Sequence, residues 1–188
     1  MCGRYQFFDD ANPDIAALIE QLRGHMDPAE FAQLSLFEVF PGQRVPAYVY
    51  DRQNSSFRLV TMDWGLPGHN GSLLINARSE TVREKNTFRN MQICLIPACG
   101  YYEWAKEPRQ KYYFSIPEPP VWLCGLYTKT VEGLRFVIVT EPATMPQAMI
   151  HDRQPVLLPK EKAAEACRRN DIDLARSASI TLRTMRAV

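Results

Sequence analysis

Between residues 45 and 140 the chain consists of short runs rich in β-branched and aromatic residues, separated by groups of turn-forming residues. The runs cover residues 45–50, 57–62, 72–76, 93–97, 101–104, 111–116, 121–127 and 134–140, with turn-forming groups such as 51–54 and 117–120 between them. Short runs of this kind, spaced by turns, are typical of strands that pair with their neighbours in sequence. The pattern therefore predicts a mainly antiparallel sheet or barrel.

Helical patterns lie near the two ends of the chain. Residues 12–24 begin with Asn-Pro, repeat apolar residues at helical spacing and end at a glycine, which is typical of a capped amphipathic helix. Residues 27–34 predict a second, shorter helix, residues 160–170 a third, and residues 179–188 a final strand. We therefore expect an α+β fold in which residues 1–188 form a single domain, with helices flanking a barrel-like, mainly antiparallel core.

The composition excludes several classes of protein. Hydrophobic residues make up 46% and charged residues 23% of the chain, a balance that argues against disorder and against membrane spanning. Asp9, Asp10 and Asp14 stand where an export signal would need a basic start and an apolar run, so we expect an intracellular protein, in the cytoplasm or nucleoid if the source is bacterial. A net charge of +1 does not by itself indicate a nucleic-acid partner.

The five cysteines are odd in number and widely spaced. Disulfide frameworks and zinc sites need paired cysteines at characteristic spacings, whereas Cys94 and Cys99 have no second Cys or His pair behind them. We therefore predict no disulfide framework, no metal site and no cofactor. Cys124 lies in an apolar run and is expected in the core.

The chain begins Met1-Cys2-Gly3, so removal of one methionine would leave a cysteine with its α-amine and its thiol on adjacent carbons. Such a 1,2-aminothiol captures an aldehyde first through nitrogen, as a Schiff base, and then through sulfur, as a five-membered thiazolidine. An α-amine has a pKa near 8, against about 10.4 for lysine, so roughly a quarter is free base near pH 7.4. Cys2 is therefore a candidate covalent catalyst, and the alternative is an ordinary buried cysteine that opens a strand.

Two other stretches place polar side chains where a sheet core would not need them. An apolar strand runs directly into Asn76; the alternative is that Asn76 caps a turn and residues 79–84 open a surface helix. Glu103 stands between two aromatic residues of a predicted strand, and alternation puts it on the face opposite to both. That face is either solvent or a pocket, and a pocket would raise the pKa of the carboxyl toward neutrality, as suits a general acid/base.

His151 is one of three histidines and lies in the polar stretch Ile-His-Asp-Arg, just before an apolar run. Its ordinary pKa makes it the candidate for titration near neutral pH. A structural histidine bonded to a loop carbonyl is the alternative.

Basic residues cluster between positions 78 and 89. The cluster contains Arg78, Arg83, Lys85 and Arg89, and Arg4 would join it if the start of the chain lies nearby. Such residues can cradle phosphates, or they can form the solvated face of a helix.

Taken together, these stretches resemble the SRAP family of abasic-site processing proteins. The matching segments are residues 1–5 (Met-Cys-Gly-Arg-Tyr), 76–81 (Asn-Ala-Arg-Ser-Glu-Thr), 94–104 (Cys-Leu-Ile-Pro-Ala-x-Gly-Tyr-Tyr-Glu-Trp) and 151–155 (His-Asp-Arg-x-Pro), in the family's order and spacing over about residues 2–160. The resemblance implies the SRAP fold and a protein that binds abasic sites in single-stranded DNA. It also implies lyase-type Schiff-base chemistry that ends in a thiazolidine crosslink through the mature Cys2, which shields the lesion from strand cleavage. We expect a monomer with no membrane partner, and a peptidase activity, including removal of Met1, is left open.

The same resemblance implies roles for single residues. Cys2 would supply both nucleophiles and Asn76 would position the α-amine. Glu103 would act as general acid/base during Schiff-base formation, and His151 would assist sugar ring opening and proton transfer. The implied DNA contacts are Arg4, Arg78, Arg153, Pro41 and Thr140, and Arg83 belongs to the basic cluster that would join them.

The sequence departs from the family pattern at a few positions. Cys99 stands where an aspartate or another small residue is usual, and Gln154 where Met or Arg is usual. Residues 65–71 lack the tryptophan pair that some members use against DNA bases, and the segment after Asn170 is short for the family.

Two other functions stay open on the sequence. Class II glutamine amidotransferases are amidohydrolases that also mature to an N-terminal Cys-Gly, but they carry an Asn-Gly step in the oxyanion region, and the Asn70-Gly71 pair here lies in a polar loop. The second alternative is a non-catalytic module that binds single-stranded DNA and in which Cys2 is incidental.

Overall fold

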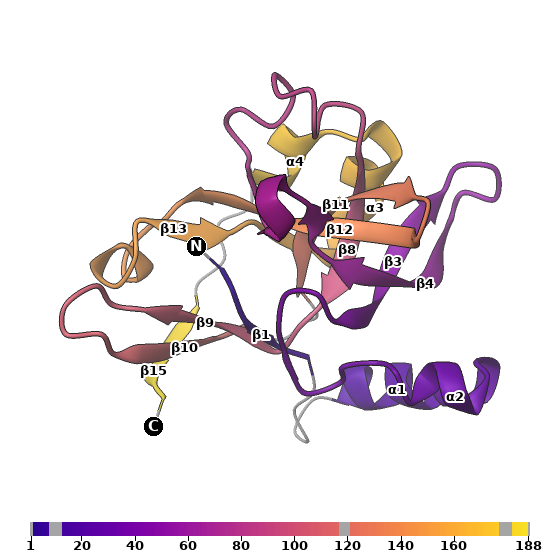
Figure 1. Ribbon diagram of the computed structural model, residues 1–188, viewed down its shortest axis with the longest axis horizontal. Coiled ribbons are helices and arrows are strands. Elements are labelled where there is room, and N and C mark those ends of the chain that lie inside the picture. Colours follow the sequence, from indigo (N-terminus) through magenta and orange to yellow (C-terminus); the bar gives the residue numbers. More distant parts are fainter. Residues whose placement is uncertain (1, 8–12, 117–120, 177–181, 188) are drawn as a thin grey trace.

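The computed structural model in Figure 1 describes residues 2–7, 13–116, 121–176 and 182–187. The larger sheet consists of β3 (Arg44–Asp51), β4 (Ser56–Trp64), β7 (Asn76–Arg78), β8 (Gln92–Pro97), β11 (Val121–Thr130), β12 (Gly133–Pro142), β13 (Arg153–Pro155) and β14 (Leu157–Pro159). The smaller sheet has the order β15 (Arg183–Arg186), β10 (Lys111–Ser115), β9 (Gly100–Trp104), β1 (Tyr5–Gln6) and β2 (Glu38–Val39). β5 (Leu66–Pro67) and β6 (Leu73–Leu74) form a small ribbon.

The larger sheet closes on itself as a barrel. β12 pairs with β11 and also with β4, and β4, β3, β8 and β11 follow one another in order. Among the described residues the pairings are antiparallel, except that β12 runs parallel to β4 and to β7. Closure pairs the edges that an open sheet would leave exposed. The predicted α+β fold with a barrel-like, mainly antiparallel core is confirmed.

The C-terminal half of β12 holds the strands that carry or adjoin the predicted site residues Asn76 and His151, because β7 and β13 both pair with it. The approach to β7 is fixed by Trp64, which is wholly buried at the end of β4. Its indole Nε1 donates to the carbonyl of Ile75 at 3.0 Å, and its ring stacks on Phe136 with centroids 6.3 Å apart. Asn76 therefore follows directly after a residue that is tied to the barrel wall.

The helices cover the outside of this barrel. They are α1 (Pro13–His25), α2 (Pro28–Phe31), α3 (Lys160–Arg169) and α4 (Ile172–Arg176), with single turns η1 (His69–Gly71) and η2 (Gln147–Met149) in the loops. α1 buries Ile15, Leu18 and Leu22, which recur on one helical face, and the Asp27 carboxylate caps α2 by accepting the Ala29 N–H at 2.8 Å. In Figure 1, α1 and α2 lie at the lower right and α3 and α4 at the top. None of the helices in the described ranges has the length and apolarity needed to cross a membrane.

The sequence patterns located most elements and missed the shortest. The predicted run at 72–76 is wrong as a single strand, because it divides into β6 and β7 on either side of Ile75. β1, β2, β13, β14 and α4 were missed, since two to five residues are too few for a period to register. The alternative of a helix at 79–84 is wrong, because that segment consists of turns. Asn12, residues 117–120 and residues 179–181 and 188 lie outside the described ranges.

Candidate functional site

The pairing of β1 with β9 brings the start of the chain into the interior. The N–H of Tyr102 donates to the carbonyl of Arg4 at 2.9 Å, which continues the ladder toward the first residues. Cys2 is wholly buried there, with its Sγ 3.9 Å from the same Arg4 carbonyl. Burial, and after it the nearby Glu103 carboxylate, raises the pKa of the Cys2 thiol well above its usual range. The thiol is therefore neutral at pH 7.

Asn76 contacts Cys2 directly, although 74 positions separate them in sequence. The Asn76 Nδ2 donates to the Cys2 carbonyl at 2.9 Å. The Asn76 Oδ1 is buried and has no hydrogen-bond partner among the described residues. A buried acceptor without a donor costs about 1–3 kcal/mol, so this oxygen would gain from an N–H placed beside it. Asn76 opens β7, so the alternative of a turn cap is wrong.

Glu103 lies on the inner face of β9, with only 3% of its surface exposed. Burial raises the pKa of its carboxyl to about 7, and the Asp152 carboxylate adds to the effect. The neighbours Tyr102 and Trp104 are half-buried on the opposite face. The alternative of a solvated outer face is therefore wrong, and the carboxyl is buried with the raised pKa that the pocket interpretation predicted.

His151 lies in the connection between β12 and β13. Its Nδ1 lies 3.0 Å from the N–H of Arg153 and 2.9 Å from the Asp152 Oδ1, and these contacts need opposite protonation states. Burial lowers the pKa of the ring, so the neutral form holds at pH 7: Nδ1 accepts from Arg153 and the proton stays on Nε2. Protonation of Nδ1 would break the hydrogen bond from the Arg153 N–H and favour the contact with the Asp152 carboxylate. The Nδ1 atom of the ring thus bonds to the backbone N–H of Arg153.

Residues from four separate segments meet at this place. Asn76 binds Cys2, Glu103 acts on the Cys2 thiol through its charge, and Asp152, beside His151, acts on Glu103. A thiol, an amide, a carboxyl that titrates near neutrality and a neutral imidazole are thus gathered at one end of β12. Such a set can position an N-terminal amine and move protons to and from it.

Some of the predicted DNA contacts are exposed, and others are buried within the protein. Arg78, at the end of β7, is exposed, and its side chain makes no hydrogen bond or ion pair within the described ranges. Arg4 donates to Glu38 at 3.1 Å and lies over the ring of Phe40, 4.2 Å from its centroid. Pro41 follows Phe40 and is half-buried.

Arg153 is an internal clamp. It is 9% exposed, its two Nη atoms bind the two carboxylate oxygens of Glu80, and Nη2 also donates to the carbonyl of Thr140 at 2.7 Å. Thr140 is wholly buried in β12. This cluster joins β13, β12 and the turn after β7, so it holds the His151 segment against the Asn76 strand.

Arg83 is likewise occupied within the protein. Its guanidinium donates to the carbonyls of Arg89, Met91 and Asn170, which tie the turns after β7 to the end of α3. Burial lowers its pKa. The basic cluster seen in the sequence therefore contains both an exposed arginine, Arg78, and an anchored one.

Sequence reasoning did not single out Tyr5 and Tyr101, which lie near the Cys2 thiol. They face each other across the β1–β9 ladder, both are wholly buried, and neither hydroxyl has a hydrogen-bond partner among the described residues. Burial, followed by the charge of Cys2, raises the pKa of both hydroxyls. Strand alternation could have found Tyr101, because residues 101 and 103 share one face of β9.

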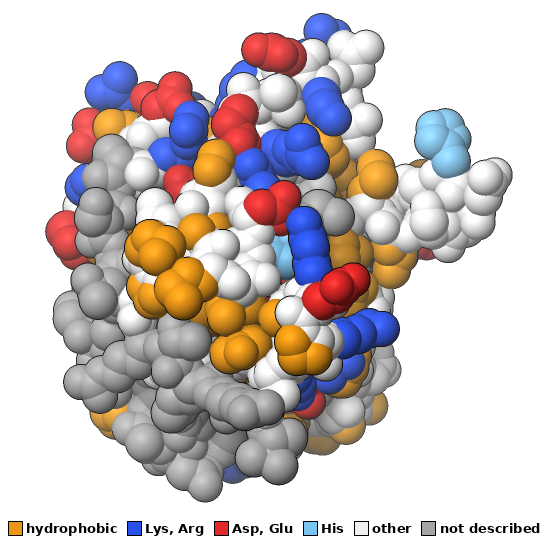
Figure 2. All heavy atoms as spheres, turned by 90° about the vertical axis from the view of Figure 1, so that its left-hand side faces the viewer, with side chains coloured by type: hydrophobic (Ala, Val, Ile, Leu, Met, Phe, Trp, Pro, Cys, Tyr) orange, Lys and Arg blue, Asp and Glu red, His pale blue; other side chains and the backbone are white. Residues whose placement is uncertain are grey.

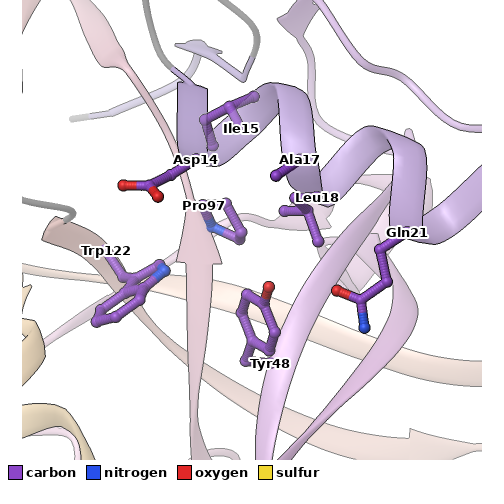
Figure 3. A pocket seen from close by; sticks show the side chains of 8 residues that line it. All are labelled: Asp14, Ile15, Ala17, Leu18, Gln21, Tyr48, Pro97 and Trp122. Atoms are coloured by element: carbon purple, nitrogen blue, oxygen red, sulfur yellow. The ribbon is translucent and has the colours of Figure 1, made fainter.

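Cys99 and a cavity beside α1 are separate from the contacts of this cluster. Cys99 is buried and its thiol donates to the carbonyl of Phe7 at 3.2 Å. A cavity of about 260 Å³ opens between α1 and the sheet, where Tyr48, Trp122 and Asp14 line it (Figure 3). It contains one carboxylate and none of the four clustered residues. Within the described ranges, no group of three or more His, Cys, Asp or Glu could hold a metal ion.

Comparison with known proteins adds a family and a fold. The family described as SOS response associated peptidase (SRAP) matches residues 1–184. Abasic site processing protein YoqW of Bacillus subtilis is 33% identical over 183 residues, which cover 88% of this chain and 79% of the relative. Abasic site processing protein YedK of Escherichia coli is 29% identical over 179 residues, with coverage of 88% and 78%. The crystal structure of a phage-related protein of Bordetella bronchiseptica has the same fold, with a TM-score of 0.71, 24% identity and coverage of 99% and 94%.

The raised pKa of Glu103 predicts how stability depends on pH. The folded state holds the proton of the Glu103 carboxyl more tightly than the unfolded chain does. The contribution of this proton to the free energy of unfolding is therefore complete below pH 4.5 and is lost as pH rises through about 7. Glu103→Gln removes this loss, which amounts to about 3 kcal/mol at most. In urea unfolding, the variant should therefore gain on the wild type between pH 5 and pH 8. Glu107→Gln, in the exposed hairpin tip, is the control, and a Glu103→Gln difference that is equal at both pH values would contradict this account.

The ion pair between Arg153 and Glu80 predicts the opposite dependence of stability on pH. Arg153 holds the pKa of the Glu80 carboxyl at about 2, so the contribution of Glu80 is present above pH 4.5 and is lost as pH falls through about 2. Because Glu80 is one-third exposed, Glu80→Gln should lower the free energy of unfolding by about 2 kcal/mol at pH 7. The difference should shrink toward pH 2 when unfolding is followed by circular dichroism. Glu84→Gln, on the same turn but exposed, should leave stability unchanged; equal losses in both variants would rule out the clamp.

Proposed function

Because the chain belongs to the SRAP family, we propose that it recognises abasic sites in single-stranded DNA and forms a thiazolidine crosslink through Cys2 after removal of Met1. The observation that carries the proposal is the convergence of Asn76 and Glu103 on Cys2. The names of the relatives, which are abasic site processing proteins, agree with it. In this proposal residues 1–188 act as one domain and as a monomer.

The proposed reaction begins at the α-amine of the mature Cys2. The amine attacks the aldehyde carbon of the ring-opened deoxyribose, and loss of one water gives an imine. The thiol then adds across the C=N bond: the S–C bond forms, and the thiol proton ends on the nitrogen. A neutral, buried thiol fits this order, because it is a weak nucleophile until the imine is in place. Capture of the imine removes the group that would promote loss of the 3′ phosphate.

The proton transfers are assigned to Glu103 and His151. A carboxyl with a pKa of about 7 is present in both protonation states near neutrality, so it can donate to the departing water and then accept from the thiol. The neutral His151 ring can assist opening of the closed sugar. The Asn76 Oδ1, a buried acceptor without a partner among the described residues, suits the N–H of the attacking amine.

The DNA contacts are proposed in two groups. Arg78, exposed at the end of the Asn76 strand, is the direct phosphate contact, and Arg4, beside Phe40 and Pro41, is the second. Arg153, with Thr140, acts as a positioning residue for His151 as long as Glu80 holds it. Arg83 supports the turn after β7 from within.

Removal of the Cys2 thiol should separate the two steps of the reaction. Mature wild-type protein incubated with a single-stranded oligonucleotide that contains one abasic site should give a shifted, heat-stable band on a denaturing gel. Cys2→Ala keeps an α-amine, so the heat-stable band should disappear while borohydride still traps an imine. Cys167→Ala, which alters a buried thiol in α3, should keep the band.

The same experiment decides between the alternatives. No covalent band from protein whose Met1 is absent by mass spectrometry would overturn the crosslinking proposal. Binding of equal affinity in wild type and Cys2→Ala, with no covalent product in either, would indicate a non-catalytic DNA-binding module. Release of ammonia from glutamine would indicate an amidohydrolase.

A further inference from the structure

The connection between β12 and β13, residues 143–152, is a pinned loop that ends at His151 and Asp152. The Ala143 N–H donates to the Asp152 carbonyl at 3.0 Å, which closes the loop at its base. The His151 N–H donates to the Gln147 carbonyl at 3.0 Å, and Gln147 itself is 4% exposed and anchors η2 inward. The conformation of the loop is thus fixed by its own hydrogen bonds.

Two methionines point outward from this anchored loop. Met145 is 68% exposed and Met149 is 72% exposed, so neither contributes its apolar surface to the core. By contrast, the aromatic rings of Phe40 and Trp104 are partly covered, because the Arg4 guanidinium lies 4.2 and 5.1 Å from their ring centroids. Both methionines therefore leave most of their apolar side chains open to solvent.

Basic charge lies beside the end of the loop that carries these methionines. Lys106, exposed at the tip of the β9–β10 hairpin, is close enough to His151 and Asp152 for its charge to act on both. Figure 1 shows this hairpin tip and the β12–β13 connection side by side at the left edge of the molecule. On that face, hydrophobic side chains gather toward the middle and basic side chains lie above and to the right of them (Figure 2). Apolar and cationic groups side by side match the two parts of a nucleotide, its base and its phosphate.

We propose that Met145 and Met149 pack against the face of the nucleobase next to the abasic site, while Lys106 faces the adjoining phosphate. This inference rests on the proposed function, because it is the missing base that leaves a neighbouring base face uncovered. Methionine suits the role, since its thioether is flexible and polarizable and packs well on aromatic faces. Apolar side chains, methionine among them, are used in this way against unstacked bases. The loop leads directly to the candidate site, since Met149 stands two residues before His151.

The test compares the affinities of wild type and variants for DNA that cannot form an imine. A single-stranded oligonucleotide with one tetrahydrofuran residue imitates the abasic sugar without its aldehyde, and fluorescence anisotropy gives the dissociation constant. The Met145→Ala/Met149→Ala double variant should bind it about tenfold more weakly than wild type. On a second oligonucleotide, in which the flanking nucleosides are also tetrahydrofuran residues, wild type and variant should bind equally. Met145→Leu/Met149→Leu should restore most of the affinity for the first oligonucleotide.

Val131→Ala is the matched control, since Val131 is a fully exposed apolar residue in the turn between β11 and β12 and should not affect either affinity. Equal binding of the double variant and wild type to the first oligonucleotide would overturn the inference. So would a loss that is the same on both oligonucleotides, because the methionines would then not contact bases. The wild-type crosslink on aldehyde-bearing DNA is read separately, so a failure of the proposed function is distinguished from a failure of this surface.

Discussion

The antiparallel pairing of β1 with β9 places the start of the chain inside the protein, and the rest of the candidate site depends on it. A chain terminus is normally mobile, but here the ladder continues through the Tyr102 N–H to the carbonyl of Arg4. The Asn76 amide then fixes the Cys2 carbonyl from the barrel side. Without both contacts the thiol would have no fixed relation to Glu103. The barrel contributes by holding β7 in place through Trp64 and β12.

The polar groups around Cys2 carry a cost in the free protein. The hydroxyls of Tyr5 and Tyr101 and the Oδ1 of Asn76 are buried without partners among the described residues, and the Glu103 carboxyl titrates far from its ordinary pKa. Each such group opposes folding by roughly 1–3 kcal/mol. The Arg153–Glu80 clamp, the closed barrel and the buried Trp64 offset part of this cost. Unpaired buried groups concentrated at one place are typical of functional sites, which is why this cluster is the candidate site.

The sequence predicted the fold class and the long strands because their periods are strong, and it indicated the candidate site residues because four motifs stand in the order of a known family. It could not predict that Glu103 is buried, since alternation fixes a face but not what covers that face. Nor could it separate Arg78 from Arg153 and Arg83. All three are arginines in polar stretches, and only the pairing of β7 and β13 with β12 reveals that Glu80 occupies Arg153. Tyr101 was missed because a tyrosine in a strand is ordinary until its hydroxyl is found unpaired.

The central claim of this account is that the nitrogen and the sulfur of one residue, Cys2, capture the same aldehyde carbon. Tandem mass spectrometry of the digested crosslink tests it most directly. The account predicts an adduct on an N-terminal peptide that begins at Cys2, lighter by one water than the sum of peptide and abasic sugar and unchanged in mass by borohydride, because a closed thiazolidine has no C=N bond to reduce. An adduct on a lysine, or one on Cys2 that gains two hydrogens on borohydride treatment, would contradict it.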